Sequence, residues 1–186
     1  KDRASEAELP SSITFLQGYH ARRVEDLDVF SRWERSEPHR TLAAPIGMMA
    51  GRKLFYLNVL DGNEAHGPHG LLAGTTGSGK SELLQSWILS MAVSYHPHDV
   101  NFVIIDYKGG GMANLFGGTP HVAGVITNIS TSDGSGQPGA GSDQTQRALL
   151  SLKSEIKRRQ KIFSEFGVNH IDQYSKLYRQ GTAAEP

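Results

Sequence analysis

Apolar residues recur along the chain with two different periods, and the change of period separates predicted helices from predicted strands. Between Ser11 and Glu34 they recur three or four positions apart, which predicts short helices. Ser11 or Ser12 is suited to cap the first of these helices. Pro38 ends the region, which we interpret as a helical appendage beside the main domain.

The remainder of the chain favours an α/β fold. Leu42–Ile46 and Leu54–Leu60 are strand-like and are separated by glycines, so a hairpin is expected there. Strands and helices then alternate, which predicts a mainly parallel sheet covered on both faces. The predicted strands are Leu71–Ala73, Asn101–Ile105 and Ala123–Thr127, and the predicted helices are Lys80–Tyr95, Gln144–Phe166 and Ile171–Arg179.

A glycine-rich segment between a predicted strand and a predicted helix carries the chemistry. Residues 74–81 read GTTGSGKS and match the phosphate-loop pattern G-x-x-x-x-G-K-[ST] in the strand–loop–helix context that it requires. Its backbone N–H groups can surround an anion, and the helix adds the positive end of its dipole. Lys80 is suited to the β- and γ-phosphates, and the Ser81 hydroxyl to Mg²⁺. The predicted ligand is therefore ATP with Mg²⁺, bound by Gly74, Thr75, Thr76, Gly77, Ser78, Gly79, Lys80, Ser81 and Glu82.

Asp106 is a second candidate site residue, because it ends the predicted strand 101–105 and precedes Tyr107, Lys108 and three glycines. A carboxylate at the carboxyl end of a parallel strand lies on the ligand side of the sheet. Spacing leaves two interpretations equally open. Asp106 is either the Walker B carboxylate that holds Mg²⁺ through water, or a residue of a neighbouring strand near the site, together with Lys108.

Composition narrows the remaining possibilities. The 186 residues carry 19 basic and 19 acidic side chains, and this zero net charge argues mildly against a dedicated nucleic-acid binder. The absence of cysteine excludes disulfides, thiolate metal sites and cysteine nucleophiles. No apolar run reaches the roughly 18 residues of a membrane span, and the polar start lacks a signal-peptide core. The histidine pairs 66/69 and 96/98 lack a third ligand at supporting spacing, so surface or capping roles are expected.

Two further segments leave alternatives open. The Gly/Ser/Pro tract 133–142 reads as a flexible surface loop or as an inserted linker. The basic residues of the longest predicted helix form either a solvated face or a contact with a neighbouring subunit or a polyanion. They are Lys153, Lys157, Arg158, Arg159 and Lys161.

Several separate stretches, spanning roughly residues 12–186, together resemble the FtsK/SpoIIIE ATPases, and within them the EssC/YukB-type motors of type VII secretion. They are HGPHGLLAGTTGSGKSE (66–82), HPHDVNFVIIDYKGGGMANLF (96–116), PHVAGVITN (120–128), EIKRR (155–159) and VNHIDQYSKLY (168–178).

The resemblance implies a RecA-like P-loop NTPase core of the ASCE type, with three α/β/α layers. Residues 1–40 would be the helical appendage or linker, and residues 41–186 the N-terminal part of the core. It also implies ATP and Mg²⁺ as ligands, and assembly with neighbouring ATPase modules or subunits into a ring or hexamer. The parent would be a plasma-membrane protein with this segment in the cytoplasm, driving small helical substrates of the WXG100 type through membrane-embedded secretion components. Asp106 would then lie on the second strand and would not be Walker B.

The sequence departs from the family pattern in one respect. No apolar strand ends in Asp-Glu before Pro186, so the Walker B glutamate is expected to be missing, the module to be incomplete at its C-terminus, and hydrolysis by this chain alone to be an open question. Three other functions remain as alternatives. They are a double-stranded DNA translocase module, which the zero net charge disfavours, a small P-loop kinase, and a non-hydrolysing regulatory nucleotide-binding module.

Overall fold

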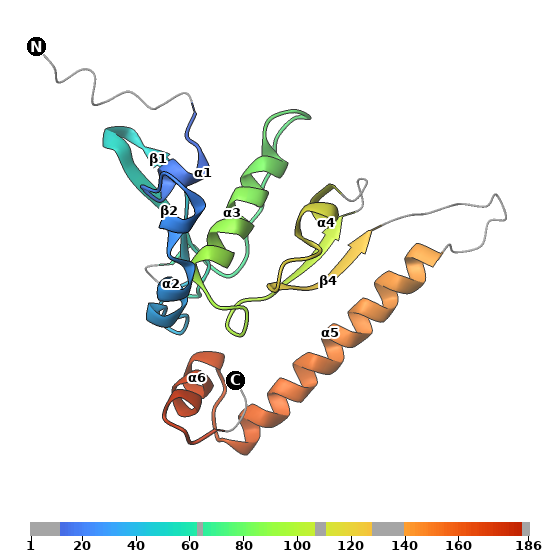
Figure 1. The fold of residues 1–186 in the computed structure, drawn as a ribbon. Coiled ribbons are helices and arrows are strands. Elements are labelled where there is room, and N and C mark those ends of the chain that lie inside the picture. The colour runs from blue at the N-terminus through green and yellow to red at the C-terminus, as the bar shows by residue number, and fades with distance from the viewer. Residues whose placement is uncertain (1–11, 63–64, 107–110, 128–139, 184–186) are drawn as a thin grey trace, which may run out of the picture. The chain divides into compact units, whose positions relative to one another are not determined.

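The computed structural model describes residues 12–62, 65–106, 111–127 and 140–183 (Figure 1). Contacts divide the chain into two units, Lys1–His96 and Pro97–Pro186.

Short helices open the first unit, as the sequence predicts. They are α1 (Phe15–Gly18), the 3-10 turn η1 (Val24–Leu27) and α2 (Val29–Arg35). The N-cap of α1 is Thr14, so the prediction of Ser11 or Ser12 as the cap is wrong. Gln17 stands three residues after Thr14 and completes a capping box: the Thr14 hydroxyl accepts from the Gln17 amide at 3.3 Å, and Gln17 Oε1 accepts from the Thr14 amide at 2.8 Å.

An antiparallel hairpin follows, which confirms the predicted pair of strands. β1 (Ala43–Met49) pairs with β2 (Lys53–Asn58), and the register shifts between Pro45 and Gly47. The strands are joined by the 3-10 turn η2 (Ala50–Arg52).

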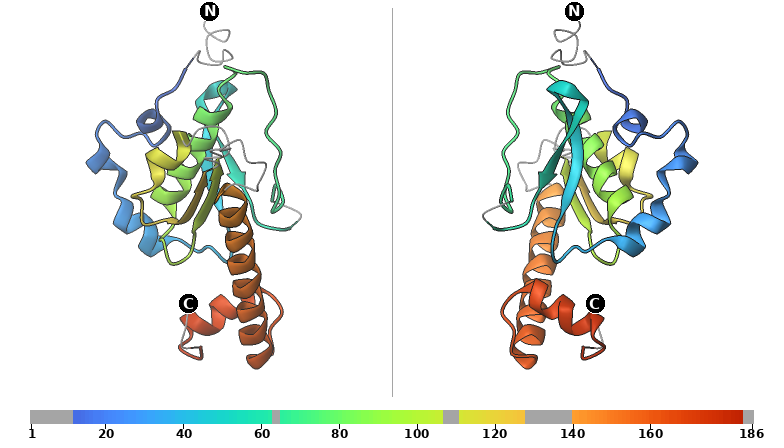
Figure 2. Two further views of the ribbon diagram at one scale, coloured as in Figure 1. Left: turned by 90° about the vertical axis from the view of Figure 1, so that its right-hand side faces the viewer. Right: turned by 90° about the vertical axis from the view of Figure 1, so that its left-hand side faces the viewer.

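The helix α3 (Lys80–Ser94) lies within one residue of its predicted end and packs against both β1 and α2. Figure 2 shows the hairpin running beside it. Its buried residues belong to its C-terminal half and are Ile88, Ser90, Met91, Ala92 and Val93. Val93 joins Ala21 and Leu27 in a buried apolar cluster, so the appendage and α3 share one small core.

The predicted strand Leu71–Ala73 is wrong, because these residues adopt no regular structure. A strand is stabilised by its hydrogen-bonded neighbours, and both sheets among the described residues are two-stranded pairs that do not include this segment. Leu71 is accordingly 95% exposed.

The second unit contains a parallel strand pair, β3 (Phe102–Asp106) and β4 (Val122–Thr127). The two strands are connected through α4 (Gly111–Phe116), which packs against both of them and is not among the predicted helices. Ile104 and Ile126 are buried, whereas Val103 and Ile105 on the alternate face of β3 are 41% and 47% exposed.

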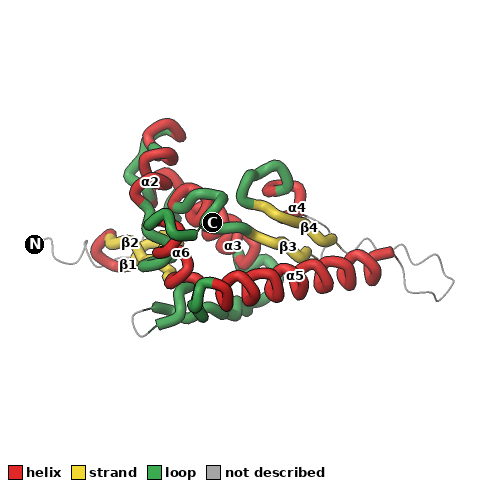
Figure 3. Tube along the Cα trace, turned by 90° about the horizontal axis from the view of Figure 1, so that it is seen from below, coloured by secondary structure: helices red, strands yellow, loops and turns green. Residues whose placement is uncertain are grey.

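The last two helices are α5 (Ala140–Glu165) and α6 (Ile171–Arg179), and Figure 3 shows α5 as one long uninterrupted helix. α5 starts before the predicted Gln144, so the end of the Gly/Ser/Pro tract is helical, and residues 133–139 lie outside the described residues. Tyr174 of α6 is buried, with its ring centre 5.6 Å from that of Phe163 and 5.4 Å from that of Phe166. None of the helices described here is both long and apolar enough to cross a membrane.

Candidate functional site

The predicted phosphate loop folds as a tight turn that leads directly into α3. Gly77 and Gly79 have φ values of 79° and 85°, in the left-handed region where a side chain would be strained. α3 begins at Lys80, and the Leu83 amide makes its bond to the Gly79 carbonyl at 2.9 Å. Because the N-cap residue is a glycine, no side chain caps this end of α3. The first-turn amides therefore stay accessible to an anion.

The side chain of Lys80 folds back across the loop that precedes it. Its Nζ atom donates to the carbonyl oxygens of Gly74 at 2.8 Å and Thr75 at 2.5 Å, and lies 3.4 Å from Ser78 Oγ. The Ser78 amide donates to the Thr75 carbonyl at 3.3 Å, which tightens the turn. The Lys80 ammonium is thus held against the loop by hydrogen bonds that a phosphate oxygen could replace. The phosphate-loop pattern requires a cation at this residue.

Close contact across the loop explains the residue type at position 74. A Cβ atom added to Gly74 would lie 2.6 Å from Ser78 Oγ and 3.6 Å from the Lys80 Cδ atom. A side chain there would displace the Ser78 hydroxyl and disturb the Lys80 stem. Position 74 therefore requires glycine because a side chain would not fit, whereas positions 77 and 79 require it because their φ angles are positive.

The polar groups of this segment face solvent. Residues 74–78 are exposed, as are Ser81 and Glu82 at the start of α3. The Ser81 hydroxyl is accessible to a cation, whose oxygen ligands in proteins include hydroxyls, carboxylates and phosphates. Glu82 in the first turn interacts favourably with the helix dipole and adds a carboxylate beside Ser81.

Asp106 has a structural role in the second unit. Its Oδ2 atom accepts a hydrogen bond from the Met112 amide at 3.2 Å, which ties the end of β3 to the first turn of α4. Lys108, the other residue predicted near the site, lies outside the described residues.

Local contacts involve residues of the histidine pair 66/69 and of the basic cluster on α5. His66 pairs with Asn58: its Nδ1 atom accepts from the Asn58 amide at 3.1 Å, and its own amide donates to the Asn58 carbonyl at 2.8 Å. Glu155 on α5 accepts from Nε of both Arg158 and Arg159, each at 2.8 Å. These bonds lower the pKa of Glu155 to about 2. Part of the basic cluster on α5 is therefore engaged with a carboxylate of the same helix.

The contacts that the appendage makes with α3 were not predicted from the sequence. Tyr19 and Trp33 both donate side-chain hydrogen bonds to carbonyl oxygens of α3. Their partners are 71 and 59 residues away in the sequence, so no local spacing could reveal them. The available signal was the residue type, since a partly buried Tyr or Trp needs a partner for its O–H or N–H.

Comparison with known proteins places the chain in a family. The sequence model of the FtsK/SpoIIIE family matches residues 31–186, most of the chain. The chain belongs to the FtsK/SpoIIIE family. This confirms the resemblance read from the motif stretches and, with it, the P-loop NTPase fold class.

The chain is similar to two secretion proteins over most of its length. The chain is 51% identical over 178 residues to the type VII secretion system protein EssC of Staphylococcus aureus, and 49% identical over 175 residues to the ESX secretion system protein YukB of Bacillus subtilis. These matches cover 96% and 94% of the chain, but each spans only 11% of the relative.

A solved structure supports the same fold. The cytoplasmic domain of the type VII secretion ATPase EccC of Thermomonospora curvata matches with a TM-score of 0.80 at 30% identity, over 95% of this chain and 20% of that one. The chain therefore corresponds to a small part of each of these proteins.

Proposed function

We propose that the chain is an ATP-binding module of an FtsK/SpoIIIE-type motor that drives type VII protein secretion. The observation that carries the proposal is the loop 74–79, which turns through two left-handed glycines and places Lys80 Nζ over the carbonyls of Gly74 and Thr75. The chain's membership of the FtsK/SpoIIIE family supports a nucleotide as the ligand, and its 51% identity to EssC supports secretion as the process.

The donor set fits a triphosphate with Mg²⁺. Exposed backbone amides of the loop and of the first turn of α3 would hold the phosphate oxygens, and Lys80 would exchange its bonds to loop carbonyls for bonds to the β- and γ-phosphates. The Ser81 hydroxyl would coordinate Mg²⁺, which neutralises charge between two phosphates when it is bound. The binding set is Gly74, Thr75, Thr76, Gly77, Ser78, Gly79, Lys80, Ser81 and Glu82.

The partners follow from the relatives rather than from this site. We propose that neighbouring ATPase modules or subunits pack around the module in a ring, and that the parent works with membrane-embedded secretion components on small helical substrates of the WXG100 type. The module would lie on the cytoplasmic side of the membrane, as does the domain of EccC whose structure it resembles. The boundary at residue 40 between appendage and core is part of the same proposal.

Nucleotide titration tests the proposal directly. A fluorescent ATP analogue is titrated with and without Mg²⁺ against the wild-type chain, Lys80→Ala and Lys153→Ala, which removes an exposed lysine of α5. Hydrogen bonds to charged groups contribute about 1.5–3 kcal/mol, so Lys80→Ala should weaken binding roughly 10-fold to 150-fold. Lys153→Ala should bind as the wild type does. Equal binding by Lys80→Ala and wild type would refute the assignment.

A second measurement distinguishes the competing activities. We expect slow ATP turnover by the chain alone, since no strand ending in Asp-Glu is present in its sequence to supply the carboxylate that activates water. Transfer of phosphate to small acceptors would instead favour a kinase, and tight duplex-DNA binding that strengthens at low salt would favour a DNA translocase.

A further inference from the structure

The P-loop helix α3 is anchored through one end. Ile88 and Met91 in its C-terminal half are 5% and 2% exposed, whereas Leu83 and Leu84 near its start are each 37% exposed. The direction in which Lys80 and its neighbours point is therefore set by contacts at the opposite end of the helix.

The appendage supplies two directional contacts to the anchored end. The Tyr19 hydroxyl donates to the Ser90 carbonyl oxygen at 3.1 Å, and the Trp33 indole Nε1 donates to the Ala92 carbonyl oxygen at 2.9 Å. Ala92 is among the last four residues of α3, whose carbonyls lack partners within the helix. The Trp33 indole therefore caps α3 from outside.

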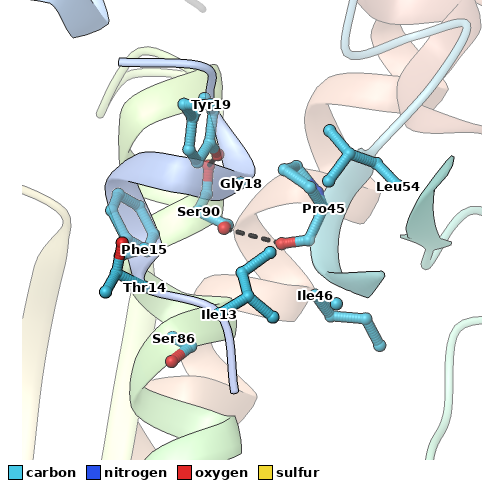
Figure 4. Close-up of a pocket in the computed structure, with 11 residues that line it drawn as sticks. Ile13, Thr14, Phe15, Gly18, Tyr19, Pro45, Ile46, Leu54, Ser86 and Ser90 are labelled. Atoms are coloured by element: carbon cyan, nitrogen blue, oxygen red, sulfur yellow. Dashed lines mark hydrogen bonds between the residues drawn. The ribbon is translucent and has the colours of Figure 1, made fainter. Parts of the chain in front are cut away.

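The hairpin side of α3 is held in the same way. Ser90 Oγ donates to the Pro45 carbonyl oxygen at 2.7 Å, which Figure 4 shows as a dashed line, and the Tyr95 hydroxyl donates to the Ala43 carbonyl oxygen at 2.9 Å. The C-terminal half of α3 is thus fixed between the appendage and β1, with side-chain hydrogen bonds on both sides.

The two appendage aromatics are themselves held in place. The Arg32 guanidinium lies 4.9 Å from the centre of the Tyr19 ring, and its Nε atom donates to the Leu27 carbonyl at 2.6 Å. The Trp33 ring makes edge contacts with Phe30 and His96, with ring centres 5.6 Å and 5.0 Å apart. Because their neighbours fix these rings, the hydrogen bonds to α3 have defined directions.

The seam between appendage and helix is not filled by side chains. A cavity of about 80 Å³ lies among α1, β1 and α3, lined by residues that include Ile13, Tyr19, Ser86 and Ser90 (Figure 4). Packing alone leaves α3 room to tilt there. The hydrogen bonds of Tyr19 and Trp33 therefore help to set its angle, together with those of Ser90 and Tyr95 on the β1 side.

We propose that Tyr19 and Trp33 are positioning residues for the nucleotide site: by fixing the orientation of α3, they place Lys80 and Ser81 against the triphosphate. The inference rests on the proposed function. α3 has 15 residues, and at about 1.5 Å per residue a tilt of about 5° at its anchored end moves its first residue by about 2 Å. A binding constellation tolerates roughly 0.5 Å.

The coupling has to act in both directions. If the contact of Trp33 with α3 favours nucleotide binding, nucleotide binding must favour that contact to the same degree. Bound ATP should therefore change the environment of the Trp33 indole, a response that a residue serving only general stability would not show.

The test combines affinity with this optical signature. Tyr19→Phe and Trp33→Phe remove the donors and keep the aromatic bulk, and Tyr178→Phe, at an exposed position of α6, is the matched control. One neutral hydrogen bond contributes about 0.5–1.5 kcal/mol, so each variant should bind ATP about 2-fold to 12-fold more weakly, with the control unchanged. Circular dichroism checks that every variant is folded at the measuring temperature.

The fluorescence measurement uses the Trp87→Phe variant. The sequence contains two tryptophans, so Trp33 is then the only tryptophan that emits. ATP with Mg²⁺ should shift the Trp33 emission, and Lys80→Ala in the same background should abolish the shift. Binding that neither Tyr19→Phe nor Trp33→Phe weakens would overturn this inference alone. Weakened binding with an unchanged emission would overturn it as well, since general destabilisation would then explain the loss. Failure of the wild-type chain to bind ATP would overturn the proposed function and this inference together.

Discussion

The Lys80 ammonium nitrogen lies 2.8 Å from the carbonyl oxygen of Gly74, so the cation expected to meet the triphosphate is bound to the loop that would surround it. An ammonium has three N–H donors and no acceptor. Loop carbonyls and phosphate oxygens therefore compete for the same donors. Nucleotide affinity is the difference between these two sets of bonds, not the strength of the lysine–phosphate contact alone.

Ser81→Ala is expected to remove the effect of Mg²⁺ on ATP binding without abolishing binding itself. The substitution deletes the hydroxyl proposed as a metal ligand and leaves the backbone amides and Lys80 in place. The measurement is the ratio of ATP affinities with and without Mg²⁺, which should fall to about one. Ser154→Ala, on the exposed surface of α5, is the control. A variant that keeps the full Mg²⁺ enhancement would show that another group holds the ion.

Two glycine-to-alanine substitutions should act in opposite directions. Gly79 has a φ of 85° and open space around its missing Cβ, so Gly79→Ala should cost about 1–2 kcal/mol of folding free energy through the backbone alone. Gly18 ends α1, and an added Cβ would make an ordinary 3.7 Å contact with Ile13 Cδ1. Gly18→Ala should therefore stabilise the fold by about 0.5 kcal/mol. Urea unfolding measures both, and a destabilising Gly18→Ala would contradict this account.

Asp106→Ala should destabilise α4 by about 1 kcal/mol, because the Met112 amide loses its carboxylate partner. Asp106→Asn keeps an acceptor oxygen and should retain most of that stability. Hydrogen exchange at Met112 and urea unfolding report the effect. If Asp106→Asn kept its stability but lost the Mg²⁺ dependence of ATP binding, Asp106 would be a metal-holding residue after all.

Alkaline pH should weaken the tyrosine hydrogen bonds that connect the C-terminal end of α3 to β1 and to the appendage. Burial raises the pKa of Tyr95 from 10.0 to about 12, and burial likewise raises the pKa of Tyr19. A group whose pKa is raised in the folded state contributes stability that is complete below its unfolded pKa and is lost as pH rises through the folded pKa. Stability contributed by Tyr95 should therefore fall between about pH 10 and pH 12.

Urea unfolding across this pH range, with tyrosinate absorbance recorded in parallel, tests the expectation. Tyr95→Phe should show a shallower alkaline loss of stability than the wild-type chain. A single shared titration of all six tyrosines would argue against selective burial.

Element positions were largely predictable from the sequence where periodicity was strong. α3, α6, β4 and the hairpin lie within a few residues of their predicted bounds. α6 is strongly amphipathic and the strands are rich in branched residues, whereas α3 is a long apolar segment without a marked polar face. Short segments were less predictable. Leu71–Ala73 has the composition of a strand but lacks a paired neighbour, and α4 is a six-residue helix after a glycine run, with no periodicity to reveal it.

For the candidate site, the sequence proposes a set of residues but not their contacts. The pattern of glycines and Lys80 specifies which groups can meet a phosphate. It does not specify that Lys80 folds onto Gly74 and Thr75, or that Trp33 reaches Ala92, since those depend on packing between distant segments.

The uncovered aliphatic side chains of β3 have a practical consequence for the protein in solution. Leu149 and Leu150 of α5 are likewise exposed, to 49% and 63%. The formal net charge is zero at pH 7, so electrostatic repulsion between molecules is weakest under neutral conditions. Self-association should therefore be strongest near neutrality and in sulfate-rich buffers, and a moderately acidic or alkaline buffer of low ionic strength should keep the chain dispersed.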